Sequence, residues 1–130
     1  MASIFTRIVQ GEIPCYKIAE TEDYLAFLDV RPQHRGHTLV ITKREIDYIF
    51  NVEDDLLAGL MLFAKRVAKA VEKTVPCKRI GVAVVGLEVP HTHIHLMPIN
   101  NVSDLGFGHS ITLSSEEMSD LAQKIATNFV

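Results

Sequence analysis

The sequence predicts an α+β domain with an antiparallel sheet of five strands and two main helices. Two observations lead to this fold class. Five short segments rich in β-branched and aromatic residues lie between turn residues, as strands do. Two longer segments repeat apolar residues at helical spacing. The strands come in runs of two, one and two with helices between them, and this order favours an antiparallel sheet.

The expected strands cover residues 15–20, 24–30, 37–42, 78–86 and 91–97. The first two strands form a hairpin around the turn at Glu22-Asp23, and the last two form an antiparallel pair. Residues 3–10 are expected to make a short helical turn, and residues 45–50 another. Asp29 ends an otherwise apolar run, so from its local context it is either a turn former or a functional acid.

The long helix is expected over residues 52–75, with Asn51 as its cap and Pro76 as its stop. Its apolar stripe is typical of packing against a sheet. The last helix begins at the capping box Ser114-x-x-Glu117 and runs to about residue 128. Its apolar face is expected to pack on the sheet or on a second subunit.

Composition limits the possible functions. The chain has 130 residues, of which 48% are hydrophobic, and this suits a single domain over residues 1–130. The net charge of −3 gives no basic surface for nucleic acid. No segment approaches the ~20 apolar residues of a membrane span. Cys15 and Cys77 form no disulfide framework, so a reducing, cytoplasmic location is expected.

The segment from His91 to Met97 carries three of the six histidines, at positions 91, 93 and 95. Side chains two apart in a strand point to the same face, so the three imidazoles are expected to line one surface. An uncharged imidazole is able to act as a metal ligand, together with a further ligand such as an acid. It is equally able to attack phosphorus and form a covalent phosphohistidine. Spacing alone leaves both chemistries open.

The run His91-x-His93-x-His95-Leu96-Met97 resembles the signature of the histidine triad (HIT) family. Residues 3–14, 27–32 and 36–41 are also similar to the opening segment and central strands of that family. The resemblance implies a five-stranded antiparallel sheet with two helices. It also implies a homodimer in which two sheets join into one of ten strands.

The resemblance implies a nucleotidyl hydrolase that acts on the α-phosphate of nucleoside phosphoramidates, acyl-nucleotides or dinucleoside polyphosphates. His93 would be the nucleophile that carries the nucleotide covalently. His95 would lie by the phosphate and leaving group, and His91 and His37 would orient the nucleophile. Histidine rather than glutamine at position 95 favours hydrolysis over transfer.

The resemblance also assigns a purine nucleotide site. Asp29 would bind the ribose hydroxyls, and Glu88 and Val89 lie just before the triad, where relatives contact the phosphate and leaving group. The apolar walls around the base would be Phe5, Ile8, Phe27, Val30 and Leu39.

Two departures from the family pattern bear on function. Many members bind structural zinc through an opening Cys-x-x-Cys, but Ser3 and Thr6 stand at those positions. We therefore expect no metal and no cofactor. Leu87 and Glu88 stand where relatives have glutamine and serine, and a carboxylate near a phosphate repels it unless protonated or turned away. A nucleotide-binding regulatory protein with little turnover, or a His-rich metal-binding module, are the alternatives.

Overall fold

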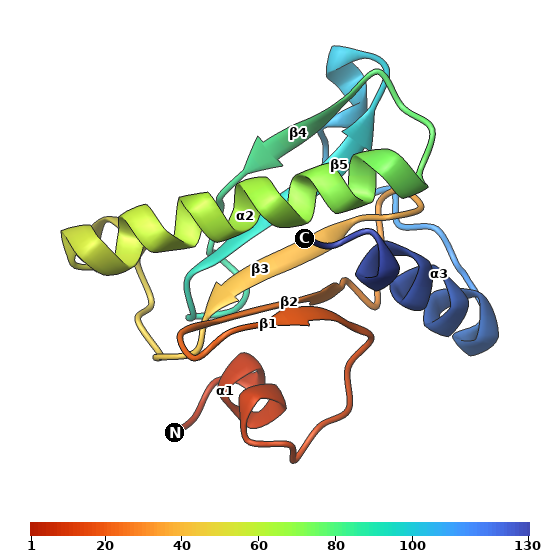
Figure 1. The fold of residues 1–130 in the computed structure, drawn as a ribbon. Helices are drawn as coiled ribbons and strands as arrows, with labels where there is room; N and C mark the ends of the chain where they lie inside the picture. Colours follow the sequence, from red (N-terminus) through yellow and green to blue (C-terminus); the bar gives the residue numbers. More distant parts are fainter.

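The computed structural model describes residues 1–130, and a single antiparallel sheet forms its centre (Figure 1). The strand order across the sheet is β1-β2-β3-β5-β4, so β1 and β4 are the edges. The strands are β1 (Lys17–Glu20), β2 (Tyr24–Leu28), β3 (Thr38–Thr42), β4 (Arg79–Ala83) and β5 (His93–Ile99). The predicted fold class, the β1–β2 hairpin and the antiparallel β4–β5 pair are confirmed.

Three α-helices accompany the sheet: α1 (Ile4–Val9), α2 (Asp54–Thr74) and α3 (Ser115–Thr127). Two single 3-10 turns, Ile49–Asn51 and Val102–Asp104, lie in the connections. The capping box predicted for the last helix is present, because Ser114 and Glu117 each bond the other's backbone N–H. None of these helices combines the length and apolar character that crossing a membrane requires.

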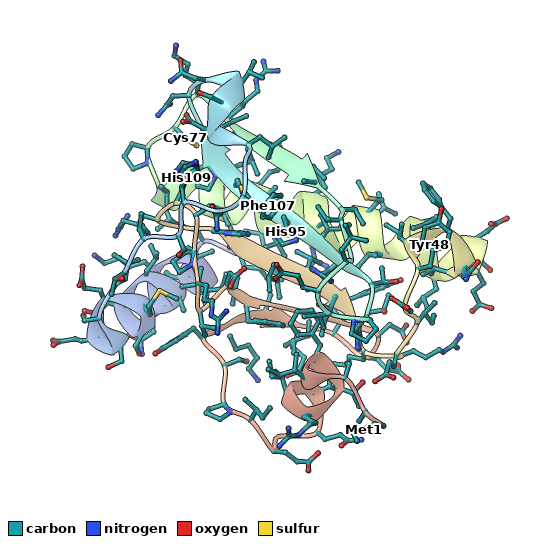
Figure 2. The ribbon with its side chains drawn as sticks, turned by 180° about the vertical axis from the view of Figure 1, so that it is seen from behind. Met1, Tyr48, Cys77, His95, Phe107 and His109 are labelled. Atoms are coloured by element: carbon teal, nitrogen blue, oxygen red, sulfur yellow. The ribbon has the colours of Figure 1, made fainter.

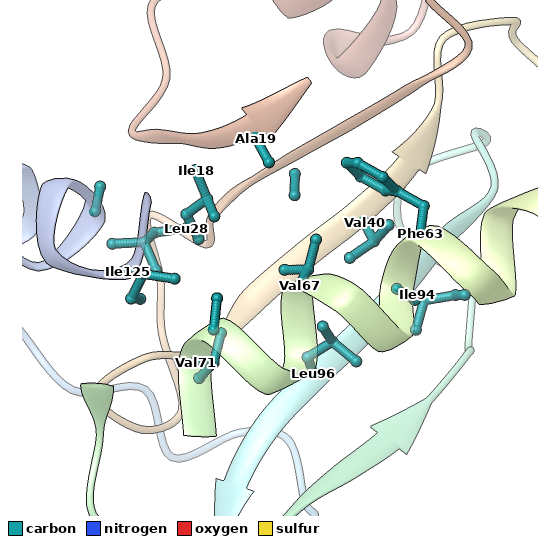
Figure 3. Close-up of a cluster of buried hydrophobic side chains, with 14 of the residues drawn as sticks. Ile18, Ala19, Leu28, Val40, Phe63, Val67, Val71, Ile94, Leu96 and Ile125 are labelled. Atoms are coloured by element: carbon teal, nitrogen blue, oxygen red, sulfur yellow. The ribbon is translucent and has the colours of Figure 1, made fainter. Parts of the chain in front are cut away.

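Helices α2 and α3 cover one face of the sheet (Figure 1). Their apolar stripes meet the side chains of every second strand residue, such as Ile94 and Leu96 on β5 (Figure 3). This main core holds 18 buried residues, all apolar. Burial of apolar side chains at about 25 cal/mol per Å² makes this layer the main source of stability. The helix-covered face of the sheet thus forms the core, and any functional site in the sheet must lie on the opposite face.

The opposite face carries a smaller apolar cluster that α1 partly covers. Five buried residues form it: Phe5, Leu25, Phe27, Leu39 and Ile41. Figure 2 views the molecule from this side and shows His95 with Phe107 in the middle of the face.

The prediction that all three triad histidines lie within one strand was wrong. β5 begins at His93, and Pro98, expected just after the strand, lies inside it. The His91 backbone N–H donates to the Val89 carbonyl at 2.8 Å, so the chain turns there and does not pair with a neighbouring strand. Pro98 is tolerated because β3 ends at Thr38, opposite Leu96.

Other predicted boundaries were also too long. Strand β2 ends at Leu28 rather than residue 30, and β4 ends at Ala83 rather than residue 86. Asn51 does not cap α2, because it belongs to the preceding 3-10 turn. The residue before the helix is instead Glu53, whose side chain makes no cap hydrogen bond.

Gly36 sets the path of the chain into β3. Its φ of +94° lies in the left-handed region, and a Cβ there would come 2.9 Å from Val75 Cγ2 and 3.1 Å from Pro98 Cγ. We expect Gly36→Ala to lower the free energy of unfolding by about 2–4 kcal/mol, the sum of backbone strain and overpacking. Urea denaturation measures this change.

The matched control is Gly11→Ala. Gly11 also has a positive φ, +80°, but a Cβ at this position would have no neighbouring atom within 4 Å. Backbone strain alone would then cost about 1 kcal/mol. Equal losses for both variants would show that packing against Val75 and Pro98 adds nothing.

Candidate active site

The histidine face is built by cross-strand neighbours. His93 lies opposite Ile41, and His95 lies opposite Leu39. Directly opposed residues in an antiparallel pair share a face, so both imidazoles point to the side of the smaller apolar cluster. Phe27 lies opposite Leu39 in the next pair, which extends the same face across β2.

The ring of His93 has its tautomer fixed by the backbone. Its Nδ1 lies 2.6 Å from the His91 carbonyl oxygen, an acceptor only, so Nδ1 carries the proton. In the neutral ring Nε2 then keeps its lone pair. The Phe5 ring packs edge-on against the His93 ring, with centroids 5.0 Å apart. His93 keeps 6% of its surface exposed, so solvent still reaches the residue. A neutral imidazole held in this way is chemically able to act as a nucleophile.

A chain of hydrogen bonds also fixes the tautomers of His37 and His95. The Gln33 backbone N–H donates to His37 Nδ1 at 3.0 Å, so the proton of neutral His37 lies on Nε2. That N–H donates to His95 Nδ1, 2.9 Å away. The proton of His95 therefore lies on Nε2. Because a backbone N–H only donates, the direction of the whole chain is fixed, and His95 presents a hydrogen-bond donor to the site.

Burial keeps these two imidazoles neutral. Burial and the neighbouring His34 and His93 lower the pKa of His37 to about 4. Burial, with His93 and His37, lowers the pKa of His95 to about 3. Both rings are thus uncharged near neutral pH, as this chain of hydrogen bonds requires.

The lowered histidine pKa values make stability depend on pH. The unfolded chain has histidine pKa values near 6.5, so between pH 6.5 and about 4 it binds protons that the folded protein does not. We expect the free energy of unfolding to be steady above pH 7 and to fall as the pH drops through this window. His37 alone contributes roughly 3 kcal/mol to the fall. Urea denaturation at stepwise pH measures it.

Carboxylates also titrate at acid pH, so the comparison variant is His37→Asn. It lacks the titrating ring, and its stability curve between pH 6.5 and 4 is expected to be flatter than that of the natural protein. Parallel curves for the two proteins would contradict the assignment.

His91 is held at both ring nitrogens. Its Nε2–H donates to the Thr42 carbonyl at 2.6 Å, and its Nδ1 accepts from the Ser3 hydroxyl at 2.7 Å. Burial lowers the pKa of His91. Hydroxyl groups are poor zinc ligands, and His91 has no nitrogen free beside them. Ser3, Thr6 and His91 therefore do not fit the structural zinc that many members of the resembled family bind at these positions.

Asp29 lies at the other end of the histidine row. Its Oδ1 accepts the Arg31 backbone N–H at 2.9 Å, and its Oδ2 lies 3.7 Å from His37 Nε2. Burial raises the pKa of this carboxyl. Asp29, His37 and His95 lie close enough to hold a metal ion. However, the facing nitrogens of His37 and His95 already bond each other, so this group is better described as an orienting pair beside an acid.

The structure brings together most of the predicted apolar wall. Phe5, Phe27 and Leu39 are buried in the smaller cluster, and Ile8 and Val89 pack against it. Two predicted residues lie apart from it. Val30 is 70% exposed beyond the end of β2, and Glu88 is exposed in the turn before the triad.

Sequence reasoning missed Phe107 and Gln33. The Phe107 ring packs edge-on against His95, with centroids 4.8 Å apart, from the loop that follows β5. Gln33 acts through its backbone, so no property of its side chain could have indicated its role. For Phe107, the one signal was a lone aromatic residue between Gly106 and Gly108.

A cavity of about 480 Å³ borders His93, and Asp29 is not among the residues that line it. Its walls come from the connection before α2 and from the segment after β4. Apolar side chains dominate them, including Tyr48, Phe50, Val85 and Leu87.

Comparisons with known proteins agree with this geometry. The HIT-domain family model matches residues 10–102. The chain is 37% identical over 131 residues to adenosine 5'-monophosphoramidase hnt1 of Schizosaccharomyces pombe, a match covering 98% of each chain. A crystal structure of a HIT-like protein from Bartonella henselae has a TM-score of 0.85 at 29% identity, covering 98% of this chain and 96% of that one. A zinc-bound histidine triad protein from Mycobacterium smegmatis has a TM-score of 0.82 at 27% identity, covering 98% and 93%.

The matched residues span most of the chain and include the whole triad. The expectation of an enzyme of the histidine triad type is confirmed by the curated relatives. The chain belongs to the HIT-domain family, as the run from His91 to Met97 predicted.

Proposed function

We propose that this protein hydrolyses nucleotides at the α-phosphate, with nucleoside phosphoramidates as its main substrates. Acyl-nucleotides and dinucleoside polyphosphates present the same phosphorus and are further candidates. The observation that carries the proposal is the hydrogen bond from His93 Nδ1 to the His91 carbonyl, which leaves Nε2 as the attacking atom. The similarity to an adenosine monophosphoramidase supports the substrate class and a purine base.

The proposed reaction has two displacements at phosphorus. The His93 Nε2 lone pair forms a bond to the α-phosphorus while the bond to the leaving nitrogen breaks, and the departing amine takes a proton from water. His95 donates its Nε2–H to the charge that develops on the phosphate or the leaving atom. A second water then attacks phosphorus while the His93–phosphorus bond breaks. One of its protons stays on the phosphate of the departing nucleoside monophosphate, the other neutralises the hydroxide left by the first step, and neutral His93 is restored.

The two parts of the substrate would bind on different sides of His93. Asp29 and the apolar cluster around Phe27 and Leu39 would hold the ribose and base. The cavity beyond His93 would receive the leaving group. Glu88 is exposed and makes no hydrogen bond or ion pair within the chain, so it is free to turn away from the phosphate.

Trapping the intermediate tests this function. The protein is mixed with excess adenosine phosphoramidate, quenched in alkali within one turnover and digested, and the peptide carrying His93 is weighed by mass spectrometry. We expect the mass of an added adenosine monophosphate on His93. Nucleotide binding by calorimetry with no turnover and no adduct would favour the regulatory alternative.

We also infer a homodimer. Strand β4 is an edge strand, and an uncovered edge normally pairs or is protected. Exposed apolar side chains lie on it and on α2, namely Val82, Met61 and Leu62. Pairing of two β4 edges would give the ten-stranded sheet. Sedimentation is expected to give twice the 14.5 kDa chain mass, and Val82→Asp to give monomers.

Both cysteines are free, and Cys15 packs against the smaller apolar cluster. This agrees with a reducing compartment such as the cytoplasm.

A further inference from the structure

Helix α1 is joined to the triad by a hydrogen-bonded group of four residues: Ser3, Thr6, Glu45 and His91. We refer to it as the Ser3 network. Ser3, Thr6 and Glu45 lie outside the expected path of the substrate, and the proposed mechanism assigns these three residues no role. We propose that Ser3 and Glu45 are positioning residues, which orient the nucleophile His93 through His91.

The Ser3 hydroxyl has one hydrogen to give, and the surroundings decide where it goes. Ser3 Oγ accepts the Thr6 backbone N–H at 3.0 Å as the N-cap of α1. His91 Nδ1 lies 2.7 Å away and must accept, because His91 Nε2–H is given to the Thr42 carbonyl. The hydroxyl therefore donates to His91 rather than to Thr6 Oγ1, which lies farther away at 3.3 Å. Ser3 is 6% exposed, so water does not readily replace this donor.

Glu45 holds Ser3 in place from the connection after β3. A single carboxylate oxygen, Oε1, accepts both the Ser3 backbone N–H and the Thr6 hydroxyl, each at 2.6 Å. These bonds, from Ser3 first and then Thr6, lower the pKa of Glu45, so it stays ionised at neutral pH. With its own hydrogen committed to Glu45, the Thr6 hydroxyl does not compete for His91 Nδ1, which is 3.4 Å away.

Two contacts connect the Ser3 network to His93, so a change in the network would shift the His93 ring. The His91 carbonyl accepts the His93 Nδ1–H at 2.6 Å, so a shift of His91 moves the atom that fixes the His93 tautomer. The Phe5 ring, two residues after Ser3, lies edge-on to both His91 and His93, with centroids 5.7 and 5.0 Å apart. Misplacing a reacting group by about 1 Å costs on the order of 100-fold in rate.

The test compares Ser3→Ala with Ser114→Ala. Both serines are N-caps that accept a backbone N–H, so both variants lose a cap, but only Ser3 donates to a triad histidine. We expect Ser3→Ala to lower kcat about 10- to 100-fold with KM nearly unchanged. Ser114→Ala keeps the natural kcat, and Ser3→Thr, which retains the hydroxyl, restores most of the activity. An unchanged kcat in Ser3→Ala, or an equal loss in Ser114→Ala, would overturn the proposal.

The kinetic arm rests on the proposed hydrolase function, so a second arm is independent of turnover. Nitrogen-15 NMR of the imidazoles reports which ring nitrogen of His93 is protonated. We expect a single Nδ1–H form in the natural protein and in Glu45→Gln, whose amide oxygen still accepts. A mixture of tautomers is expected in Ser3→Ala and Glu45→Ala. A pure Nδ1–H form in those two variants would overturn the positioning role whether or not the protein turns over.

Discussion

Replacing His93 by alanine is expected to abolish phosphoramidate hydrolysis while nucleotide binding persists. The variant loses the only imidazole on this face whose Nδ1–H is given to a backbone carbonyl and whose Nε2 makes no hydrogen bond in the chain. Removing a covalent nucleophile lowers kcat by about 10⁴-fold or more. Asp29 and the apolar cluster are untouched, so the dissociation constant for adenosine monophosphate should change by less than about 10-fold. Steady-state kinetics and calorimetry measure the two quantities.

The matched control is His109→Ala. His109 is an exposed histidine in the loop after Phe107, and its side chain makes no hydrogen bond or ion pair. This variant should keep its full activity, which separates loss of the nucleophile from loss of any histidine. Turnover by His93→Ala at the natural rate would remove His93 from the chemistry.

The fold could be predicted because each element has a local signal. Alternating apolar residues marked the strands, helical spacing marked α2 and α3, and the capping box at Ser114 marked where α3 begins. The predicted strand and helix boundaries were wrong where a contact between residues distant in sequence determines the boundary. His91 resembles a strand residue in the sequence, but its ring bonds to Thr42 and Ser3 hold it in the turn before β5.

The candidate site was predictable only where side chains carry the signal. The histidines stood out by type and spacing, and the family resemblance added His37 and Asp29. The tautomers did not follow from the sequence, because they depend on backbone groups of Gln33 and His91. Glu45, from the connection after β3, gave no pattern of its own, and Phe107 stood out only as a lone aromatic residue between Gly106 and Gly108.

Replacing His95 by alanine is expected to lower kcat for phosphoramidates by about 10²–10³-fold, the usual effect of losing one preorganised donor. The structure assigns the donor hydrogen to His95 Nε2, because His37 fills Nδ1. The donor matters most when the leaving group is poor. The loss should therefore be large for an amine leaving group and much smaller for fluoride, with the adenosine phosphofluoridate as the test substrate.

His37→Ala supplies the comparison for that series. It leaves the His95 ring in place but removes the N–H that selects its tautomer, so His95 is free to carry its proton on either nitrogen. Since both tautomers are then populated, the competent fraction falls to about one half, and activity should fall only about 2-fold, far less than in His95→Ala. If both variants lost activity equally for amine and fluoride leaving groups, His95 would not act on the leaving group. Its effect would then come from packing against Phe107 and His93.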